Sequence, residues 1–220
     1  MRDAIGVMRL LGERSIDFKK DVFVCFVDFE KAFDRVNWTK LMEILMQICI
    51  DWRDRRLSTR LYMNQTASVR TNIGNTEPAP IGRGVRQGCL MSPTLFNIYA
   101  EAMVREALHD VSEGVKVGGK IIMDVRFAYD QAMIASTETG LQRIMDNTNR
   151  VVNQYGMRIN IKKTKVMKIG REQGRFNIEV DGKLLEQIGH FKYLGSLLAE
   201  DGYCEKEIRA RVAMAKDTFE

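Results

Sequence analysis

Residues that build metal clusters, cross-links or long linkers are scarce in this chain. Its 220 residues include 2 histidines, 4 cysteines and 3 prolines. Cysteines Cys25, Cys49, Cys89 and Cys204 are scattered and form no C-x-x-C pair. That spacing argues against a structural zinc site and against a disulfide framework. We therefore expect a reducing, intracellular compartment.

Long apolar runs are also missing. No stretch approaches the roughly 20 apolar residues that span a bilayer. In addition, charges occur too early in the first segment, MRDAIGVMRLLGERS, for a secretory signal peptide. We expect no membrane partner.

The charge balance points weakly to an acidic partner. The net charge is +5, and 45% of the residues are hydrophobic, enough to bury a substantial core. The firmer signal is local: the 18 residues from 158 to 175 contain many basic side chains and a single acid, Glu172. The basic residues are Arg158, Lys162, Lys163, Lys165, Lys168, Arg171 and Arg175.

Apolar periodicity and turn signals predict an α+β fold, with a sheet covered by helices on one face. The run VFVCFVD (22–28) predicts a buried strand, and Asn37 suits the N-cap of a following helix. Further expected elements are helices at 52–63, from Ser92, at 138–155 and at 205–219; a hairpin and loop at 66–85; strands at 121–127, near 159, at 166–169 and at 176–180; and turns at Gly118-Gly119 and Asp181-Gly182.

Two segments carry candidate chemistry before the middle of the chain. In VDFEKAFD, Asp28 ends the buried strand, where a carboxylate is costly unless it is paired or metal-bound. Taken alone, a solvated acid is the simpler interpretation. In GRGVRQGCLMSP (82–93), glycines and the donors Arg83, Arg86 and Gln87 directly precede a capped helix. That arrangement favours a nucleic-acid or phosphate contact over an ordinary loop.

The third segment is RFAYDQAMIAS (126–136). It brings Asp130 to a turn between two apolar segments, but the neighbouring residue is Tyr129. Two acids at the tips of adjacent strands are what a two-metal phosphoryl-transfer site requires, and Mg²⁺ prefers carboxylate oxygens. By itself the segment is also compatible with a surface turn that carries an aspartate.

Together these segments resemble the palm motifs of reverse transcriptases, closest to those of LINE-type retrotransposons, which lack long terminal repeats. The matching segments are VDFEKAFDRV, GVRQGCLMSPTLFNIY and RFAYDQAMIAS, followed by GMRINIKKTKVM (156–167) and HFKYLGSLLAEDG (190–202). Five motifs in the family's order extend from about residue 21 to 202. The resemblance implies the polymerase palm, an antiparallel sheet with helices behind it.

The resemblance also implies site residues. Asp28 takes the place of the first metal-binding aspartate, and the backbone of Phe29 would lie beside the same ions. Phe33 takes the place of the residue under the incoming sugar. The implied substrate-binding residues are Phe33, Arg86, Gln87, Gly88 and Lys163. Lys163 would lie near the leaving pyrophosphate. Asn160 and Thr164 belong to the same motif as Lys163. The implied primer grip is Phe191, Tyr193, Leu194 and Gly195.

Two departures from the family pattern matter. The family hairpin reads Phe/Tyr-Ala-Asp-Asp, whereas here Tyr129 replaces the first aspartate and only Asp130 remains. A phenol with a pKa near 10 is neutral at pH 7, so one negative charge is lost beside two dications. We expect Asp130, on the opposite face of the strand, to be an accessory acid that does not replace it. The second departure is length, because most of the fingers and thumb are expected to be absent.

These points define the expected organisation and function. We expect a remnant of the fingers at 1–20, the palm at 21–189, and the primer-grip hairpin with the start of the thumb at 190–220. The expected partners are an RNA template, a DNA primer and deoxynucleotide triphosphates, with two Mg²⁺ in the family and the second site doubtful here. The family implies nuclear localisation. The expected function is an RNA-directed DNA polymerase fragment impaired by Tyr129; the alternatives are a non-enzymatic nucleic-acid-binding remnant and a non-functional pseudogene product.

Overall fold

The computed structural model describes residues 2–127, 130–172 and 174–219. The chain forms two compact units. The first comprises Met1–Asp28, Ala107–Arg150 and Ile159–Glu220, and the second comprises Phe29–Glu106 and Val151–Arg158. The expected boundaries at residues 20 and 189 run along the sequence instead and stay a prediction.

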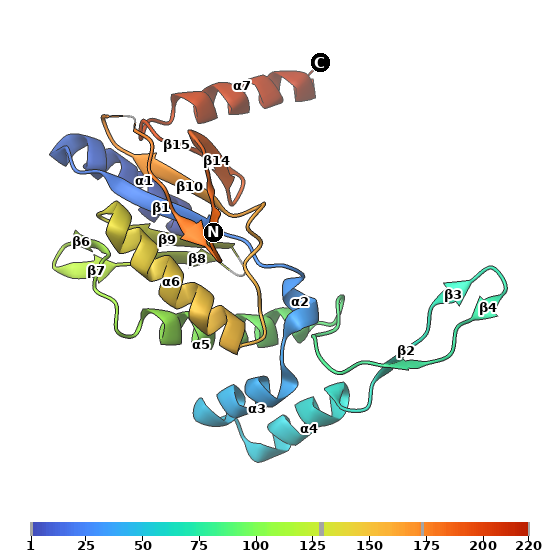
Figure 1. The fold of residues 1–220 in the computed structure, drawn as a ribbon. Helices are drawn as coiled ribbons and strands as arrows, with labels where there is room; N and C mark the ends of the chain where they lie inside the picture. The colour runs from blue at the N-terminus through green and yellow to red at the C-terminus, as the bar shows by residue number, and fades with distance from the viewer. Residues whose placement is uncertain (1, 128–129, 173, 220) are drawn as a thin grey trace. The chain divides into compact units, whose positions relative to one another are not determined.

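A five-stranded sheet forms the centre of the first unit (Figure 1). Its order is β13-β10-β1-β9-β8. The strands are β1 (Val22–Val27), β8 (Asp124–Phe127), β9 (Asp130–Ala135), β10 (Lys165–Ile169) and β13 (Glu186–Gln187). Strand β1 is central and antiparallel to both β9 and β10, with Cys25 opposite Met133 on one side and Val166 on the other. The expected buried strand is confirmed, and its unbroken apolar run reflects cover on both faces.

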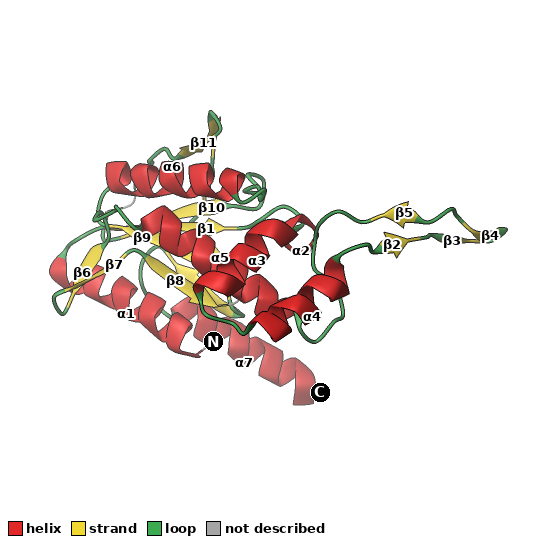
Figure 2. Cartoon of the chain, turned by 90° about the horizontal axis from the view of Figure 1, so that it is seen from below, coloured by secondary structure: helices red, strands yellow, loops and turns green. Residues whose placement is uncertain are grey.

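Helices lie on both faces of this sheet (Figure 2). Helix α6 (Glu138–Gln154) covers one face, as expected, and buries Leu141, Ile144 and Met145. The opposite face packs against helix α1 (Arg2–Phe18) and the hairpin of β14 (His190–Tyr193) and β15 (Ser196–Ala199). The α+β class is confirmed, and α1 adds a second helical cover that the sequence analysis did not predict.

Helix α1 shows why its segment was easy to overlook. Its buried residues Ala4, Met8, Leu11 and Ser15 form one narrow stripe among many charges. Ser15 Oγ donates to the carbonyl oxygens of Lys20 and Ile169, at 2.7 and 2.8 Å, which ties the end of the helix to β10. Tertiary burial of the stripe, more than local propensity, stabilises this helix.

The second unit is mainly helical. Its helices are α2 (Ala32–Arg35), α3 (Trp38–Gln47), α4 (Trp52–Tyr62) and most of α5 (Ser92–Leu108). Asn37 caps α3 as expected, with its side chain accepting from Lys40 N at 3.1 Å. Between α4 and α5 lies an exposed two-stranded arm of β2 (Thr66–Ala67), β3 (Arg70–Thr71), β4 (Gly74–Asn75) and β5 (Ala79–Pro80). The hairpin expected at 66–85 is therefore confirmed.

The remaining elements follow the turn signals. Gly118-Gly119 connects β6 (Val115–Val117) to β7 (Lys120–Ile122), and Asp181-Gly182 connects β11 (Glu179–Val180) to β12 (Lys183–Leu184). All four turn residues have positive φ, as two-residue type I′ hairpin turns require. Helix α7 (Glu205–Phe219) confirms the expected helical tail. Within the described residues, no helix is both long and apolar enough to cross a membrane.

Candidate functional site

Asp28 directly follows β1, and its backbone is fixed by the segment that precedes β10. The Asp28 N–H donates to Thr164 Oγ1 at 3.2 Å, and the Asp28 carbonyl oxygen accepts from Asn160 N at 2.8 Å. Thr164 is fully buried, so this support is rigid. Two residues of the motif at 156–167 thus position the carboxylate at the strand end.

Asp130, the first residue of β9, lies on the same side of the sheet as Asp28. The register pairs Val27 with Gln131, so the next cross-strand neighbours are Asp28 and Asp130. Both line a cavity of about 250 Å³. Desolvation raises the pKa of the Asp130 carboxyl, and the nearby charge of Asp28 raises it further. The register and the cavity therefore place Asp130 next to Asp28, and its expected role as an accessory acid stays a prediction.

Tyr129, the degenerate ligand position of the sequence analysis, lies outside the described residues, so its role stays a prediction. Among the residues that are described, no group of three or more His, Cys, Asp or Glu side chains could hold a metal ion. The carboxylates of Asp28 and Asp130 are hard oxygen donors of the kind that Mg²⁺ prefers. Their mutual repulsion would fall if one cation lay between them.

The β14–β15 hairpin forms another wall of this cavity. Phe191 stacks on Phe26, with ring centroids 4.2 Å apart, and Tyr193 Oη donates to the Val125 carbonyl oxygen at 3.1 Å. Burial raises the pKa of Tyr193 to about 12, with smaller effects from the charges of Asp130 and Asp124. Leu194 and Gly195 form the turn, with φ of 50° and 80°. Of the residues assigned to the primer grip, Phe191 and Tyr193 thus line the cavity with Asp28 and Asp130.

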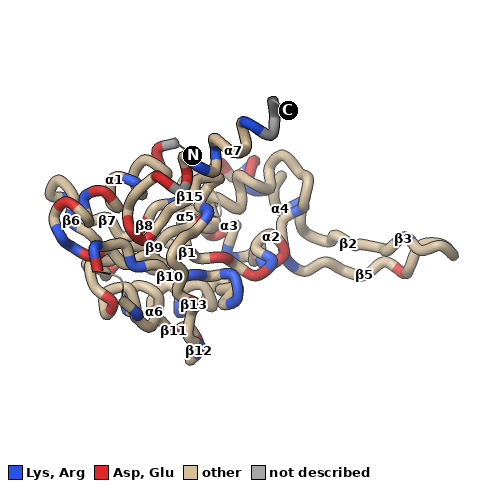
Figure 3. Tube along the Cα trace, turned by 90° about the horizontal axis from the view of Figure 1, so that it is seen from above, with Lys and Arg blue, Asp and Glu red and all other residues tan. Residues whose placement is uncertain are grey.

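Lys163 is an exposed residue of the same cavity lining. The basic run around it follows the chain into β10 (Figure 3). Part of its charge is neutralised within the first unit, because Lys165 pairs with Glu186, and Lys168 pairs with Asp21 at 2.9 Å. The net excess of charge available to an acidic partner is smaller than the sequence count suggested.

Phe33, Arg86, Gln87 and Gly88 belong to the second unit. Phe33 stacks on Phe96 with ring centroids 4.9 Å apart, and its carbonyl oxygen accepts from Val85 N at 2.8 Å. The Arg86 Nε donates to Gln65 Oε1 at 3.2 Å, while Gln87 and Gly88 are exposed. The segment that carries the Gln-Gly pair is therefore fastened to the segment that carries Phe33.

A close backbone contact makes this fastening possible. The Gly84 N–H donates to the Val36 carbonyl oxygen at 2.8 Å. Gly84 has a φ of 94°, and a Cβ there would lie 3.0 Å from the Cα and carbonyl oxygen of Asp34. Only glycine satisfies both constraints, as the sequence analysis expected of glycines in this segment.

Sequence reasoning missed two polar residues of the first unit. Gln131 is 1% exposed, and neither of its amide atoms has a hydrogen-bond partner in the described part of the chain. Glu207 of α7 accepts from Leu197 N at 2.7 Å and from Arg211 Nε at 2.6 Å, and lies 3.6 Å from Arg9 Nη2. Gln131 directly precedes the apolar run at 132–135 of β9, a signal that could have identified it, whereas Glu207 carried none.

Sequence comparison finds a match to the family of reverse transcriptases (RNA-dependent DNA polymerases) over residues 7–198. The chain is 29% identical over 196 residues to a retrovirus-related Pol polyprotein of the type-1 retrotransposable element R2 from Nasonia vitripennis, covering 80% of this chain and 18% of that protein. It is 25% identical over 183 residues to an RNA-directed DNA polymerase of the mobile element jockey from Drosophila melanogaster, covering 79% and 19%. R2 and jockey are LINE-type elements. The chain thus spans about a fifth of the length of these relatives.

Solved structures show the same fold at lower identity. Telomerase from Candida albicans, in complex with a fragment of telomeric RNA, superimposes with a TM-score of 0.62 and 16% identity, covering 92% of this chain and 34% of that one. Apo telomerase from Candida tropicalis superimposes with a TM-score of 0.62 and 16% identity, covering 94% of this chain and 39% of that one. These likenesses agree with a palm-like α+β fold. Since the family match extends over residues 7–198 of 220, this chain belongs to the reverse transcriptase family.

Proposed function

We propose that this chain is the palm region of an RNA-directed DNA polymerase of a LINE-type retrotransposon, with catalysis weakened by Tyr129. The observation that supports it best is the single cavity that joins Asp28 and Asp130 to Phe191, Tyr193 and Lys163. The ancestral reaction is the attack of a primer 3′-hydroxyl on the α-phosphate of a deoxynucleotide, with pyrophosphate leaving. Family membership supports the reaction class, and the cavity supports the proposed location at Asp28 and Asp130.

In this proposal Asp28 and Asp130 would hold Mg²⁺, with the backbone of Phe29 beside it. Bound Mg²⁺ would neutralise charge that develops on the transferring phosphate. Phe191 and Tyr193, with the turn Leu194-Gly195, would steady the primer end, and Lys163 would lie near the leaving pyrophosphate. In the second unit, Phe33 would lie under the sugar and exclude a 2′-hydroxyl. Arg86, Gln87 and Gly88 would contact nucleotide and template.

Tyr129 would lower activity because it supplies no carboxylate at the position of the family's first hairpin aspartate. With Asp28 and Asp130 alone, the first unit offers two carboxylates where two dications are to be held. Asp130 could compensate partly, since it shares the cavity with Asp28. We expect a loss on the order of 100-fold or more, equivalent to about 2.7 kcal/mol of activation free energy.

Primer extension on an RNA template with Mg²⁺ tests the proposal. Three proteins are compared: the chain as it stands, Tyr129→Asp, and Asp28→Ala as the blank. We expect Tyr129→Asp to extend the primer at least about 100-fold faster than the unchanged chain. Extension by the unchanged chain at the rate of Tyr129→Asp would show that Asp28 and Asp130 suffice and that Tyr129 does no harm.

A nucleic-acid-binding role without polymerisation is the second candidate, favoured by Tyr129 and by the exposed basic residues Lys162 and Lys163. Salt-dependent binding of a primer–template by the unchanged chain and by Tyr129→Asp, with no extension by either, would support the binding role over the enzyme. Absence of both binding and extension in a cooperatively folded protein would rule out both candidates.

A further inference from the structure

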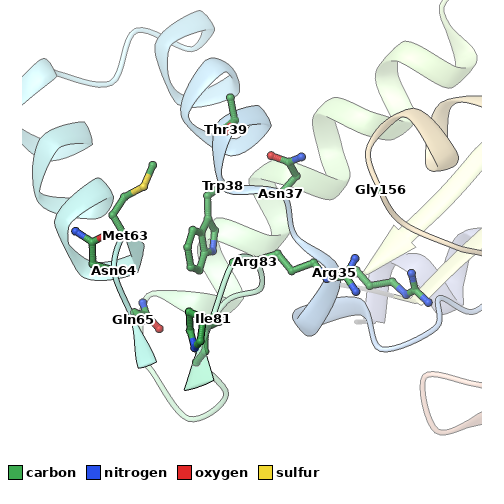
Figure 4. A pocket seen from close by; sticks show the side chains of 12 residues that line it. Arg35, Asn37, Trp38, Thr39, Met63, Asn64, Gln65, Ile81, Arg83 and Gly156 are labelled. Carbon is green, nitrogen blue, oxygen red and sulfur yellow. The ribbon is translucent and has the colours of Figure 1, made fainter. Parts of the chain in front are cut away.

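The second unit contains a cavity of about 520 Å³ that the proposed reaction does not use (Figure 4). That volume is in the range of small-ligand sites. Its lining comes from three segments: Arg35, Asn37, Trp38 and Thr39; Met63, Asn64 and Gln65; and Pro80, Ile81, Gly82 and Arg83, with Gly156 at one edge.

Arginines supply all the charge of this lining. Arg83 is exposed and has no hydrogen bond or ion pair with any residue that the structure describes. Arg35 Nη2 pairs with Glu30 at 3.1 Å, but the Arg35 Nε is buried without a partner among the described residues. Guanidinium groups with free donors bind phosphate well, because their planar N–H groups match its oxygens. The lining therefore suits an anionic ligand.

Trp38 gives the cavity a rigid aromatic wall. The Trp38 Nε1 donates to the Gly84 carbonyl oxygen at 2.6 Å, and the indole packs against Tyr62 with centroids 6.1 Å apart. Figure 4 shows its ring between Met63 and Asn64 on one side and Arg83 on the other. A fixed aromatic wall next to cationic side chains suits a planar base attached to a phosphate.

Amide groups complete the lining. Asn64 follows the end of α4, has a φ of 60°, and is an exposed residue of the lining. Gln65 is fixed, since its Nε2 donates to the Leu61 carbonyl oxygen and its Oε1 accepts from Arg86. Asn and Gln amides both donate and accept, as recognition of base edges requires.

We infer that this cavity holds one nucleotide of a single-stranded nucleic acid, with its phosphate at Arg83 and Arg35 and its base against Trp38. A base paired in a duplex could not enter a cavity of this kind, whereas an unpaired base can turn out of its strand. Exposed arginines Arg53, Arg56 and Arg60 on α4 offer contacts for neighbouring phosphates. This inference rests on the proposed function, in which the strand is the unpaired part of the RNA template.

Trp38 itself provides the readout. The chain has 2 tryptophans, and Trp52 is 55% exposed, so Trp52→Phe leaves Trp38 as the single tryptophan at little structural cost. Titration with a labelled oligouridylate then gives two signals, Trp38 emission at the cavity and anisotropy of the whole complex. We expect both signals to change with the same midpoint.

Matched charge reversals locate the contact. Arg83→Glu should raise the midpoint concentration of both titrations by about 10-fold or more, equivalent to about 1.4 kcal/mol of binding free energy. Arg70→Glu makes the same charge change on an exposed residue of β3, outside the lining, and should weaken binding by only about 2–3-fold. Circular dichroism verifies that both variants are folded.

Each other outcome has a distinct meaning. Binding seen by anisotropy, with Trp38 unchanged and the two reversals equivalent, would overturn the cavity as a site and leave the proposed function standing. If uridine monophosphate quenches Trp38 as strongly as oligouridylate at equal nucleotide concentration, the ligand is a free nucleotide and the inference of a single-stranded nucleic acid is overturned. Oligodeoxyuridylate that binds as tightly as oligouridylate would show that the cavity does not distinguish DNA from RNA, and would overturn the assignment of the strand to the RNA template. No binding by either signal would overturn both this inference and template binding.

Discussion

Asp28 and Asp130 lie on neighbouring strands and line one cavity, close enough that the charge of Asp28 helps raise the pKa of Asp130. Two carboxylates so placed destabilise the folded chain unless a cation is shared between them. We therefore expect the pair to lower the stability of the metal-free protein and a bound divalent ion to raise it.

Asp130→Asn should stabilise the metal-free protein at neutral pH. It removes a desolvated charge and its repulsion with Asp28, and we expect a gain of up to about 1 kcal/mol in the free energy of unfolding. Urea denaturation in the presence of a chelator measures it. Asp110→Asn is the control, because that side chain is 89% exposed and should change stability little. A loss of stability in Asp130→Asn would contradict the repulsion.

Mg²⁺ should raise the Tm of the unchanged chain through the same pair. At ten times the dissociation constant, binding to the folded state alone adds about 1.4 kcal/mol. Thermal scans with and without Mg²⁺, at constant ionic strength, measure the shift. Asp28→Asn and Asp130→Asn should each lose most of it. A shift of the same size in both variants would place the ion elsewhere.

Gly84→Ala should destabilise the second unit. The new methyl group would lie 3.0 Å from the Asp34 backbone, at a φ of 94° that side chains rarely adopt. We expect a loss of about 1–3 kcal/mol. Gly82→Ala is the matched control, because nothing lies within 4 Å of a Cβ there. Equal chemical denaturation midpoints for the two variants would show that the Phe33 and Gln87 segments are not fastened at Gly84.

Glu207→Ala should loosen the β14–β15 hairpin. It leaves the partly buried Leu197 N–H without its acceptor and removes the carboxylate that pairs with Arg211 and lies near Arg9, so we expect a loss of about 1–3 kcal/mol. Glu205→Gln is the control, since the Glu205–Arg209 pair is 71% and 78% exposed and should matter little. Guanidinium denaturation measures the stability of both variants, and equal losses would show that Glu207 does not hold the hairpin.

The stabilisation by Glu207, here called the Glu207 clamp, depends on pH with a definite sign. Burial alone would raise the pKa of Glu207, but the Leu197 N–H and the Arg211 guanidinium offset it and hold the pKa below its usual value. A lowered pKa in the folded state means that the stabilisation is complete above the ordinary Glu pKa and is lost as the pH falls through the folded value. The stability difference between the unchanged chain and Glu207→Gln should therefore shrink in acid.

Gln131→Leu should raise stability. Both amide atoms of Gln131 are buried without partners among the described residues, and leucine fills the space without them. We expect a gain of about 1–2 kcal/mol by urea denaturation. Gln154→Leu, at an exposed position of α6, should change stability by less than about 0.5 kcal/mol. A loss in Gln131→Leu would indicate that the amide is paired, for example by water.

Much of the fold and of the candidate site could be read from local patterns. The unbroken apolar run VFVCFVD predicted the central strand, and Asn37, Gly118-Gly119 and Asp181-Gly182 marked a cap and two turns that the structure confirms. The motifs around Asp28, Gln87 and Asp130 predicted the family. These features depend on neighbours in the chain, so the sequence carries them directly.

The pairing of distant residues could not be read that way. A one-residue shift in the register of β1 and β9 would place Asp130 on the other face, and only the observed pairing of Val27 with Gln131 brings it to Asp28. Helix α1, the Glu207 clamp and the arginine-lined cavity likewise depend on packing between segments far apart in sequence. By itself the sequence determined most of the elements, the turns and the family, because their causes are local. Tertiary structure alone decided which side chains share a cavity, because that depends on strand register and on the burial that fixes it.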